Sequence, residues 1–316
     1  MAGFIEIRNL TKIFGKNTVL DNLNLEIPYN KIFGIIGENG SGKTTLLNTL
    51  IGFLKPEKGT ILFQSLDIFK DMRGVETRFG FATQAGSFYP KLTVEENLYY
   101  FGKLYSIPRK ELKERVRKLL DLVELTYAKK TLGGSLSTGM KRRLDIACAL
   151  IHKPVVLILD EPTEDLDPIL RKELLNLIRR INEAGTTIII TSHLLEEVEE
   201  LCDVIAILHK GKLLKIGSPV AIEREYGKNE IVKLQLESRN YQAFVKKIIQ
   251  AGGKVEDVDY EGEKILIFTP KGEALLNIIM RLSRLGREKI EHVSIERMSL
   301  NIIFESIVRG EKGLMS

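Results

Sequence analysis

The feature that most constrains this chain is a glycine-rich segment between an apolar run and a helical pattern. The run Ile32–Ile36 is apolar apart from Gly34, as expected of a parallel strand that is buried on both faces. Residues 37–44 then read GENGSGKT, and a helical pattern follows them. A buried strand, a glycine-rich turn and a helix in this order predict an α/β fold.

Residues 37–44 fit the pattern G-x-x-x-x-G-K-[ST], which binds phosphate groups. Glycines let the backbone curl until its N–H groups point at phosphate oxygens, and the following helix adds its positive N-terminal end. Lys43 would supply a charge for the β- and γ-phosphates, and the Thr44 hydroxyl would bind Mg²⁺. The residues expected to bind the nucleotide here are Gly37, Glu38, Asn39, Gly40, Ser41, Gly42, Lys43, Thr44 and Thr45.

Two carboxylates, Asp160 and Glu161, follow a second apolar run at residues 155–159. Carboxylates at the end of a buried strand are costly unless they meet a cation or take part in proton transfer. We expect Asp160 near the Mg²⁺ ion, and Glu161 to orient or deprotonate the attacking water. Downstream of a phosphate loop, this pair indicates nucleotide hydrolysis.

Strands and helices alternate along the first two thirds of the chain. The apolar runs at 155–159 and 186–191 are separated by a predicted helix at 170–183, which favours a parallel sheet. Residues 22–27 alternate between apolar and polar, which predicts a half-buried strand near the N-terminus. Residues 93–150 are predicted to be helical.

The last third has a different pattern, which starts after a shift in composition at residues 226–229. The predicted elements are strands at 231–237, 254–260, 264–269 and 290–296, helices at 241–251 and 273–285, and a last helix that begins near Leu300. The order β-α-β-β-α-β matches a ferredoxin-like unit.

Composition and charge exclude some classes of protein. The net charge of +5, from 47 basic and 42 acidic residues among 316, is too mild to indicate nucleic-acid binding. No apolar run approaches the ~18 residues that a membrane-spanning helix needs, and the start MAGFIEIRNL lacks the pattern of a signal peptide. Cys148 and Cys202 lie among apolar residues and are interpreted as reduced core thiols. If this protein acts at a membrane, a partner must anchor it.

Further motifs resemble those of the ABC ATPase family and occur in the family's order. Gln84 is similar to the glutamine of the Q-loop, which approaches Mg²⁺ and the attacking water and faces the membrane partner. Residues 136–140, LSTGM, resemble the signature LSGGQ, and residues 162–167 occupy the position of the D-loop. His193 matches the switch histidine that contacts the γ-phosphate, and Phe14 lies where the family places an aromatic residue against adenine.

This resemblance covers about residues 4–220 and implies a P-loop ABC ATPase core at residues 1–226. The core would combine a parallel sheet, an antiparallel β-subdomain and a helical subdomain at about 85–150, and residues 229–316 would form a ferredoxin-like α+β accessory domain. The resemblance implies catalysis by Glu161, His193 and Gln84, further nucleotide contacts from Phe14, Ser137, Gly139 and Asp167, and metal binding by Thr44, Gln84 and Asp160.

The resemblance also implies partners. A second ATPase subunit, identical or different, would complete two sites with ATP held between the subunits. A separate membrane-spanning permease subunit would convert MgATP-driven closure and hydrolysis into transport, and would hold this chain at the cytoplasmic face of the membrane. No nucleic-acid partner is expected.

The sequence departs from the family pattern at two places near the expected subunit interface. Thr138 and Met140 replace a glycine and the glutamine of the signature, and Glu164 and Asp165 replace small or neutral residues of the D-loop. These changes put the tightness of dimer closure in doubt, because added carboxylates would lie near anionic nucleotides.

Two segments favour the ABC-2 export group, which includes drug-resistance exporters. These are residues 140–144, MKRRL, and residues 92–98, LTVEENL; residues 299–304, SLNIIF, also resemble the group's terminal helix. The mixed α+β tail disfavours the sugar-importer ATPases, which carry all-β appended domains. Two alternatives are an ABC ATPase without a membrane partner, acting on ribosomes or DNA, and a plain P-loop ATPase or kinase.

Overall fold

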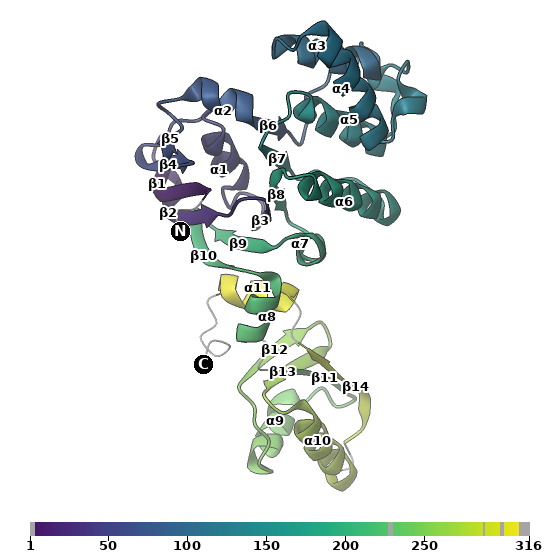
Figure 1. Ribbon diagram of the computed structural model, residues 1–316. Helices are drawn as coiled ribbons and strands as arrows, with labels where there is room; N and C mark the ends of the chain where they lie inside the picture. The colour runs from purple at the N-terminus through teal and green to yellow at the C-terminus, as the bar shows by residue number, and fades with distance from the viewer. Residues whose placement is uncertain (1–3, 227–229, 287, 298–299, 310–316) are drawn as a thin grey trace. The chain divides into compact units, whose positions relative to one another are not determined.

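The computed structural model describes residues 4–226, 230–286, 288–297 and 300–309. The chain separates into two compact units, Met1–Ser218 and Pro219–Ser316, which are described in turn (Figure 1). The predicted boundary at residue 226 therefore lies one helix later than the boundary between the compact units.

A six-stranded sheet with the order β10-β9-β3-β8-β7-β6 lies at the centre of the first unit. β9, β3, β8, β7 and β6 run parallel, of which β3, β7 and β8 contain the predicted apolar runs, and β10 is antiparallel to β9. All residues of β3, β7 and β8 are buried. The strands are β3 (Ile32–Ile36), β6 (Phe79–Ala82), β7 (Val156–Asp160), β8 (Thr187–Ser192), β9 (Val204–His209) and β10 (Lys212–Gly217).

A second, antiparallel sheet precedes and follows β3 in the sequence and has the order β2-β1-β4-β5. The alternation predicted at residues 22–27 lies in β2, where Leu23, Leu25 and Ile27 are buried. These side chains share one apolar core with residues of β3 and of the helix α1 (Lys43–Leu50). The strands are β1 (Ile5–Phe14), β2 (Asn17–Ile27), β4 (Lys58–Phe63) and β5 (Leu66–Asp67).

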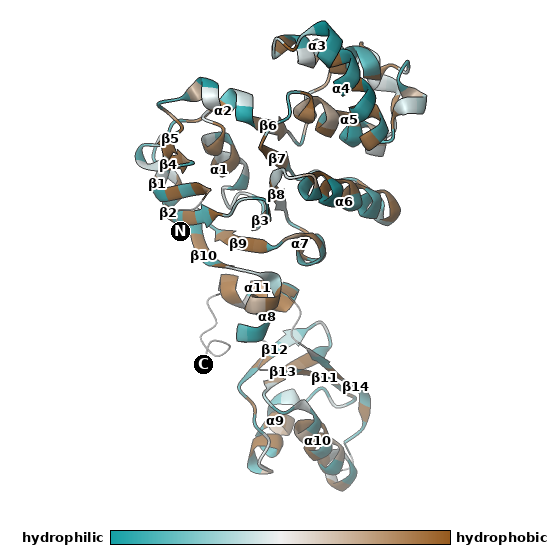
Figure 2. Ribbon diagram, viewed as in Figure 1, coloured by the Kyte–Doolittle hydropathy of each residue, from teal (hydrophilic) through white to brown (hydrophobic). Residues whose placement is uncertain are grey.

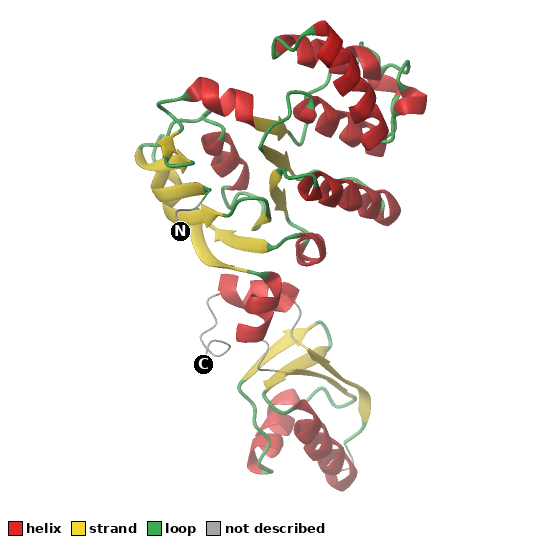
Figure 3. Cartoon of the chain, in the orientation of Figure 1, coloured by secondary structure: helices red, strands yellow, loops and turns green. Residues whose placement is uncertain are grey.

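Helices form the rest of the first unit, and those between β6 and β7 gather in a group of their own (Figure 3). The helix α6 has an apolar and a polar face, as Figure 2 shows. A capping box between Thr93 and Glu96 fixes the start of α3. The helices are α2 (Met72–Arg78), α3 (Val94–Leu104), α4 (Arg109–Leu122), α5 (Thr138–Leu150), α6 (Pro168–Glu183) and α7 (Leu195–Leu201), with short 3₁₀ turns at Thr126–Ala128 and Gly133–Ser135.

The second unit contains the predicted β-α-β-β-α-β order, and its assignment to the ferredoxin-like class remains a prediction. Its antiparallel sheet has the order β12-β13-β11-β14, and Val232, Leu234, Phe244 and Ile279 lie in its core. The predicted strand at 254–260 is found later, because pairing with β13 begins at Asp257. The elements are β11 (Glu230–Leu236), α9 (Tyr241–Gln250), β12 (Asp257–Glu261), β13 (Lys264–Thr269), α10 (Gly272–Gly286) and β14 (Ile290–Arg297).

Two further helices, α8 (Pro219–Tyr226) and α11 (Leu300–Arg309), pack against each other in this unit. Ile222 of α8 and Ile303 of α11 are buried, which explains why α8 belongs to the second unit rather than to the first. Most of the predicted linker, residues 227–229, and Ser299 lie outside the described residues. None of the described helices combines the length and the apolar character needed to cross a membrane.

Candidate functional site

Four predicted site residues follow the carboxyl ends of neighbouring parallel strands. Lys43 follows β3, His193 follows β8, Glu161 follows β7 and Gln84 follows β6. The ends of the three middle strands are nearly level, because Ile36 pairs with Ser192 while Asp160 pairs with Thr191. The sheet therefore brings these segments to the edge at which open α/β sheets bind ligands.

The phosphate loop has a backbone conformation that requires its glycines. A Cβ atom at Gly37 would lie 2.2 Å from the carbonyl oxygen of Leu208, so no larger residue fits there. Gly40 and Gly42 have φ angles of +79° and +108°, which are costly for other residues. The loop leads directly into α1, so backbone N–H groups at the start of that helix are available to a phosphate.

Lys43, Glu161 and His193 form a continuous chain of polar contacts. Lys43 is only 5% exposed, and its Nζ lies 3.2 Å from Glu161 Oε1 while it donates a 2.8 Å hydrogen bond to the carbonyl of Gly37. His193 Nδ1 donates to the other carboxylate oxygen, Oε2, at 2.6 Å. One buried carboxylate thus links the phosphate-loop lysine to the histidine.

Backbone conformation and one threonine hold the carboxylate pair in place. Glu161 has a φ of +47°, a left-handed conformation that is uncommon for a residue with a side chain. The Thr191 hydroxyl accepts from the N–H of Glu161 at 2.9 Å and donates to Asp160 Oδ1 at 2.6 Å. Such strain persists where the surroundings fix it, and it is typical of functional sites.

Oxygen donors suited to a divalent cation are present in this region. The carboxylate of Asp160 is buried at the end of β7, and the hydroxyl-bearing Thr44 is exposed in the first turn of α1. Mg²⁺ binds through one or two protein oxygens together with water and substrate phosphates. The donor set therefore fits Mg²⁺.

The side chain of Gln84 contacts the D-loop. Its Nε2 donates to the carboxylate of Glu164, and its backbone carbonyl accepts from Arg142 of α5. The sequence indicated Glu164 only as an additional charge near an interface, and no local signal revealed this partner. The unusual acidic residue of the D-loop is therefore tied to the Q-loop segment.

A second contact between this segment and α5 was also missed from the sequence. Asp145 of α5 is buried and accepts from the backbone N–H of Ser87 at 2.6 Å. Burial raises the pKa of the Asp145 carboxyl to about 6, although the Ser87 N–H and the nearby Arg142 oppose the shift. Asp145 and Arg142 together bind the Q-loop segment to the helix that follows the signature.

The signature and D-loop residues lie at helix N-termini. Ser137 is the N-cap of α5, and its hydroxyl accepts from the N–H of Met140 at 3.4 Å. Asp167 is the N-cap of α6, and its side chain accepts from the backbone N–H groups of Ile169 and Leu170, each at 3.0 Å. Gly139 is buried against Leu170. Each residue therefore has a structural role in this chain, and its contact with the nucleotide of another subunit remains a prediction.

Phe14 lies at the end of β1, where its ring is 46% exposed. Lys12 Nζ lies 5.0 Å from the ring centroid and also contacts Glu57 at 2.8 Å. An exposed aromatic ring with a lysine beside it is suited to stacking on a base. Stacking of Phe14 on adenine remains a prediction.

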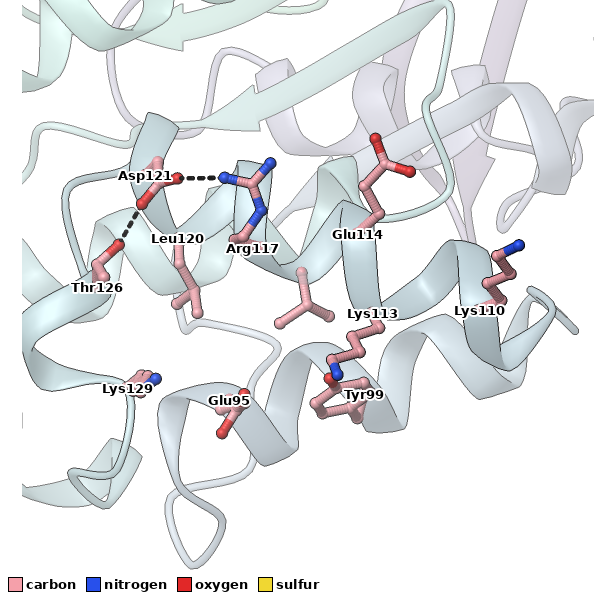
Figure 4. Close-up of a pocket in the computed structure, with 11 residues that line it drawn as sticks. Glu95, Tyr99, Lys110, Lys113, Glu114, Arg117, Leu120, Asp121, Thr126 and Lys129 are labelled. Atoms are coloured by element: carbon pink, nitrogen blue, oxygen red, sulfur yellow. Dashed lines mark hydrogen bonds and ion pairs between the residues drawn. The ribbon is translucent and has the colours of Figure 1, made fainter.

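Among the cavities that border helices of the first unit are one between α3 and α4 and one near the Q-loop segment. One, of about 440 Å³, is lined by residues of α3 and α4 that include Tyr99, Lys113 and Arg117, and it contains none of the predicted nucleotide-site residues (Figure 4). The other, of about 210 Å³, has aromatic walls from Phe79 and Phe101 and reaches Ser87, close to the Q-loop segment.

A phosphate loop after β3, the carboxylates Asp160 and Glu161 at the end of β7, and a histidine directly after β8, the strand between them, define a nucleotide-hydrolysing P-loop protein. Comparison with known proteins identifies the family more closely. Residues 20–164 match the family model described as ABC transporter.

Curated relatives and solved structures agree with this match. The chain is 36% identical over 241 residues to the linearmycin resistance ATP-binding protein LnrL of Bacillus subtilis (strain 168), covering 76% of this chain and 77% of the relative. It is 41% identical over 216 residues to the bacitracin transport ATP-binding protein BcrA of Bacillus licheniformis, covering 68% and 70%. The structure of cbiO1 from Clostridium perfringens, part of the transporter complex cbiONQ, matches with a TM-score of 0.66 and 28% identity, covering 71% of this chain and 92% of that one.

The chain therefore belongs to the ATP-binding subunits of ABC transporters, and it is an ATPase of this family. The predicted family, its α/β ATPase fold and its function as a transporter subunit are confirmed.

Proposed function

We propose that two of these subunits, alike or different, bind MgATP between them and drive export through a separate permease. The observation that carries this proposal is the contact chain from Lys43 through Glu161 to His193, beside the phosphate loop. In it Glu161, the proposed base, directly contacts both the lysine proposed to bind phosphate and the histidine.

In the proposed reaction, Lys43 binds the β- and γ-phosphates, which replace Glu161 as its partner. Glu161 then accepts a proton from the attacking water as that oxygen forms a bond to the γ-phosphorus. The bond from the γ-phosphorus to the bridging oxygen breaks, and ADP leaves with the electron pair. His193 holds the second oxygen of Glu161 and, in this proposal, also contacts the γ-phosphate.

A bound Mg²⁺, held by Thr44 and Asp160 with Gln84 nearby, would neutralise charge on the phosphates. Thr191 supports this role, because it fixes one oxygen of Asp160. In this proposal Gln84 must exchange its contact with Glu164 to approach the metal.

Dimerisation is proposed to place Ser137, Gly139 and Asp167 against the nucleotide of the second subunit. Support comes from the exposed Ser137 at the N-terminus of α5, where unpaired N–H groups and the helix dipole favour an anion. ATP would then hold the two subunits together, and hydrolysis would release them.

The export direction is supported by the relatives, whose names record linearmycin resistance, bacitracin transport and, in Burkholderia lata, Nod factor export. The last is 38% identical over 224 residues. The permease would hold the chain at the cytoplasmic face of the membrane, and a segment of it would enter the aromatic cavity beside Ser87.

The helical subdomain at about 85–150 and the C-terminal unit are proposed as separate functional parts. The C-terminal unit has its own apolar core and would support or regulate the dimer. A chain that ends at Ser218 should therefore still bind ATP. A well-folded truncated chain that fails to bind would contradict this division.

The transport proposal is tested with the copurified permease reconstituted into vesicles that expose the ATPase to added ATP. Export predicts ATP-dependent accumulation inside the vesicles of a compound that the relatives' names give, linearmycin or bacitracin. Accumulation with Glu161→Gln equal to that of the native chain, or loss of substrate from preloaded vesicles on adding ATP, would overturn it.

A further inference from the structure

Glu197 of α7 is a buried carboxylate that none of the predicted motifs includes. It is 3% exposed, although glutamate side chains are rarely buried without partners. Burial of such a group is costly unless hydrogen bonds and opposite charges compensate for the lost water. Its partners therefore indicate what it does.

The partners of Glu197 come from three other segments. Its Oε2 accepts from the Thr163 hydroxyl at 2.6 Å and from the Ser192 hydroxyl at 3.0 Å. Its Oε1 lies 3.0 Å from Arg171 Nε, close enough for an ion pair but not aligned as a hydrogen bond. Thr163 and Ser192 are themselves 2% exposed, so the cluster is closed to solvent on these sides.

Two of these partners lie within two residues of a group that is proposed to act on ATP. Thr163 lies two residues after Glu161, and Ser192 directly precedes His193. The side chains of Glu161 and His193 meet at 2.6 Å, so the same two segments are joined twice. Glu197 makes the second junction without touching either of the residues proposed to act on ATP.

We propose that Glu197 is a positioning residue for ATP hydrolysis, which fixes the loop after β7 and the end of β8 relative to each other. The inference rests on the function proposed above for Glu161 and His193. A displacement of about 1 Å at a reacting group can cost on the order of 10²-fold in rate. Hydroxyl contacts to a buried carboxylate are among the stronger hydrogen bonds, so they can hold such a spacing.

The test uses matched variants of the two ends of the Thr163–Glu197 bond. We expect Glu197→Gln and Thr163→Val to lower kcat by about 10- to 100-fold, with KM and nucleotide Kd within about threefold of the native chain. Thr163→Ser keeps the hydroxyl and should retain most of the rate. Glu196→Gln, on the exposed side of the same helix, makes the same charge change and should have native turnover.

A double-mutant cycle separates positioning from general damage. In a His193→Ala background, Glu197→Gln should lower kcat by less than about twofold, because the group it positions is gone. Full additivity, equal losses in Kd and kcat, or no rescue by Thr163→Ser would overturn the inference.

The function proposed for the site fails in a different way. If Glu161→Gln and His193→Ala keep native turnover, the proposed roles of those residues are wrong. If both lose turnover while Glu197→Gln and Thr163→Val do not, only the positioning role of Glu197 is wrong. If Glu197→Gln folds poorly, the comparison of kcat between Thr163→Val and Thr163→Ser still tests the positioning role.

Discussion

Replacing Glu161 by glutamine tests the proposed site most directly, because this substitution keeps the shape of the side chain and removes its charge. The loss of a positioned general base typically lowers the rate by about 10²–10⁴-fold. His193 retains an oxygen acceptor at this position, so its placement should change little. We therefore expect slow hydrolysis and accumulation of an ATP-bound dimer.

The same substitution should tighten ATP binding. Lys43 lies 3.2 Å from Glu161, a contact worth about 5 kcal/mol in Coulomb energy at an effective dielectric constant of about 20. Desolvation offsets much of this energy, and the glutamine retains a hydrogen bond worth about 1 kcal/mol. If about 1–2 kcal/mol remains, phosphates that displace Glu161 from Lys43 bind about 5- to 30-fold more tightly to the variant.

Fluorescent-nucleotide titration and single-turnover hydrolysis measure the two effects separately. Glu183→Gln, an exposed change at the end of α6 with the same loss of charge, is the matched control and should behave as the native chain does. Near-native turnover in Glu161→Gln refutes the assignment of the base. Weaker ATP binding by a folded variant refutes the competition between Glu161 and phosphate for Lys43.

Three further predictions concern other parts of the site. Lys43→Ala should lose nucleotide binding, whereas His193→Ala should keep it and lose turnover; equal losses of binding in a titration would show that the roles are not divided. Asp145→Asn should gain stability over the native chain as pH rises from about 4 to 6, by up to about 3 kcal/mol. The reason is that the raised pKa makes ionisation of the buried Asp145 carboxyl unfavourable in the folded state. Urea unfolding would contradict this if the difference in free energy of unfolding between the two proteins were equal at pH 4.5 and 7.5. The ATP-bound dimer of Glu161→Gln should strengthen with added salt if Glu164 and Asp165 repel the other subunit. Light scattering that shows a tight dimer, unchanged by salt, would disprove the repulsion.

The sequence predicted the parts of the site that depend on local pattern. The phosphate loop needs glycine at Gly37 and Gly42 for reasons of backbone geometry, and such requirements appear directly in the sequence. Buried parallel strands likewise appear as apolar runs, so their order placed Asp160 and Glu161 at the correct edge. These features are encoded within about ten residues each.

Contacts between distant segments could not be predicted in the same way. The bond from Gln84 to Glu164 spans 80 residues, and that from Thr163 to Glu197 spans 34. In the sequence, Glu197 is one of several acidic residues in a short helix and looks like part of a solvated face. The place of α8 in the second compact unit depends on a similar distant contact, because α8, which contains the buried Ile222, packs against α11 near the end of the described residues.

The strand order β3-β8-β7 fixes a spacing within the ATPase site. The strands that lead to Lys43 and to Glu161 do not pair with each other, because β8 lies between them and is hydrogen-bonded to both. With about 4.8 Å between neighbouring strands, the two segments begin about 10 Å apart, and they cannot approach without breaking a ladder of backbone hydrogen bonds. Changes in the site during the ATP cycle must therefore come from loops and helices, while the sheet keeps the same width in every state.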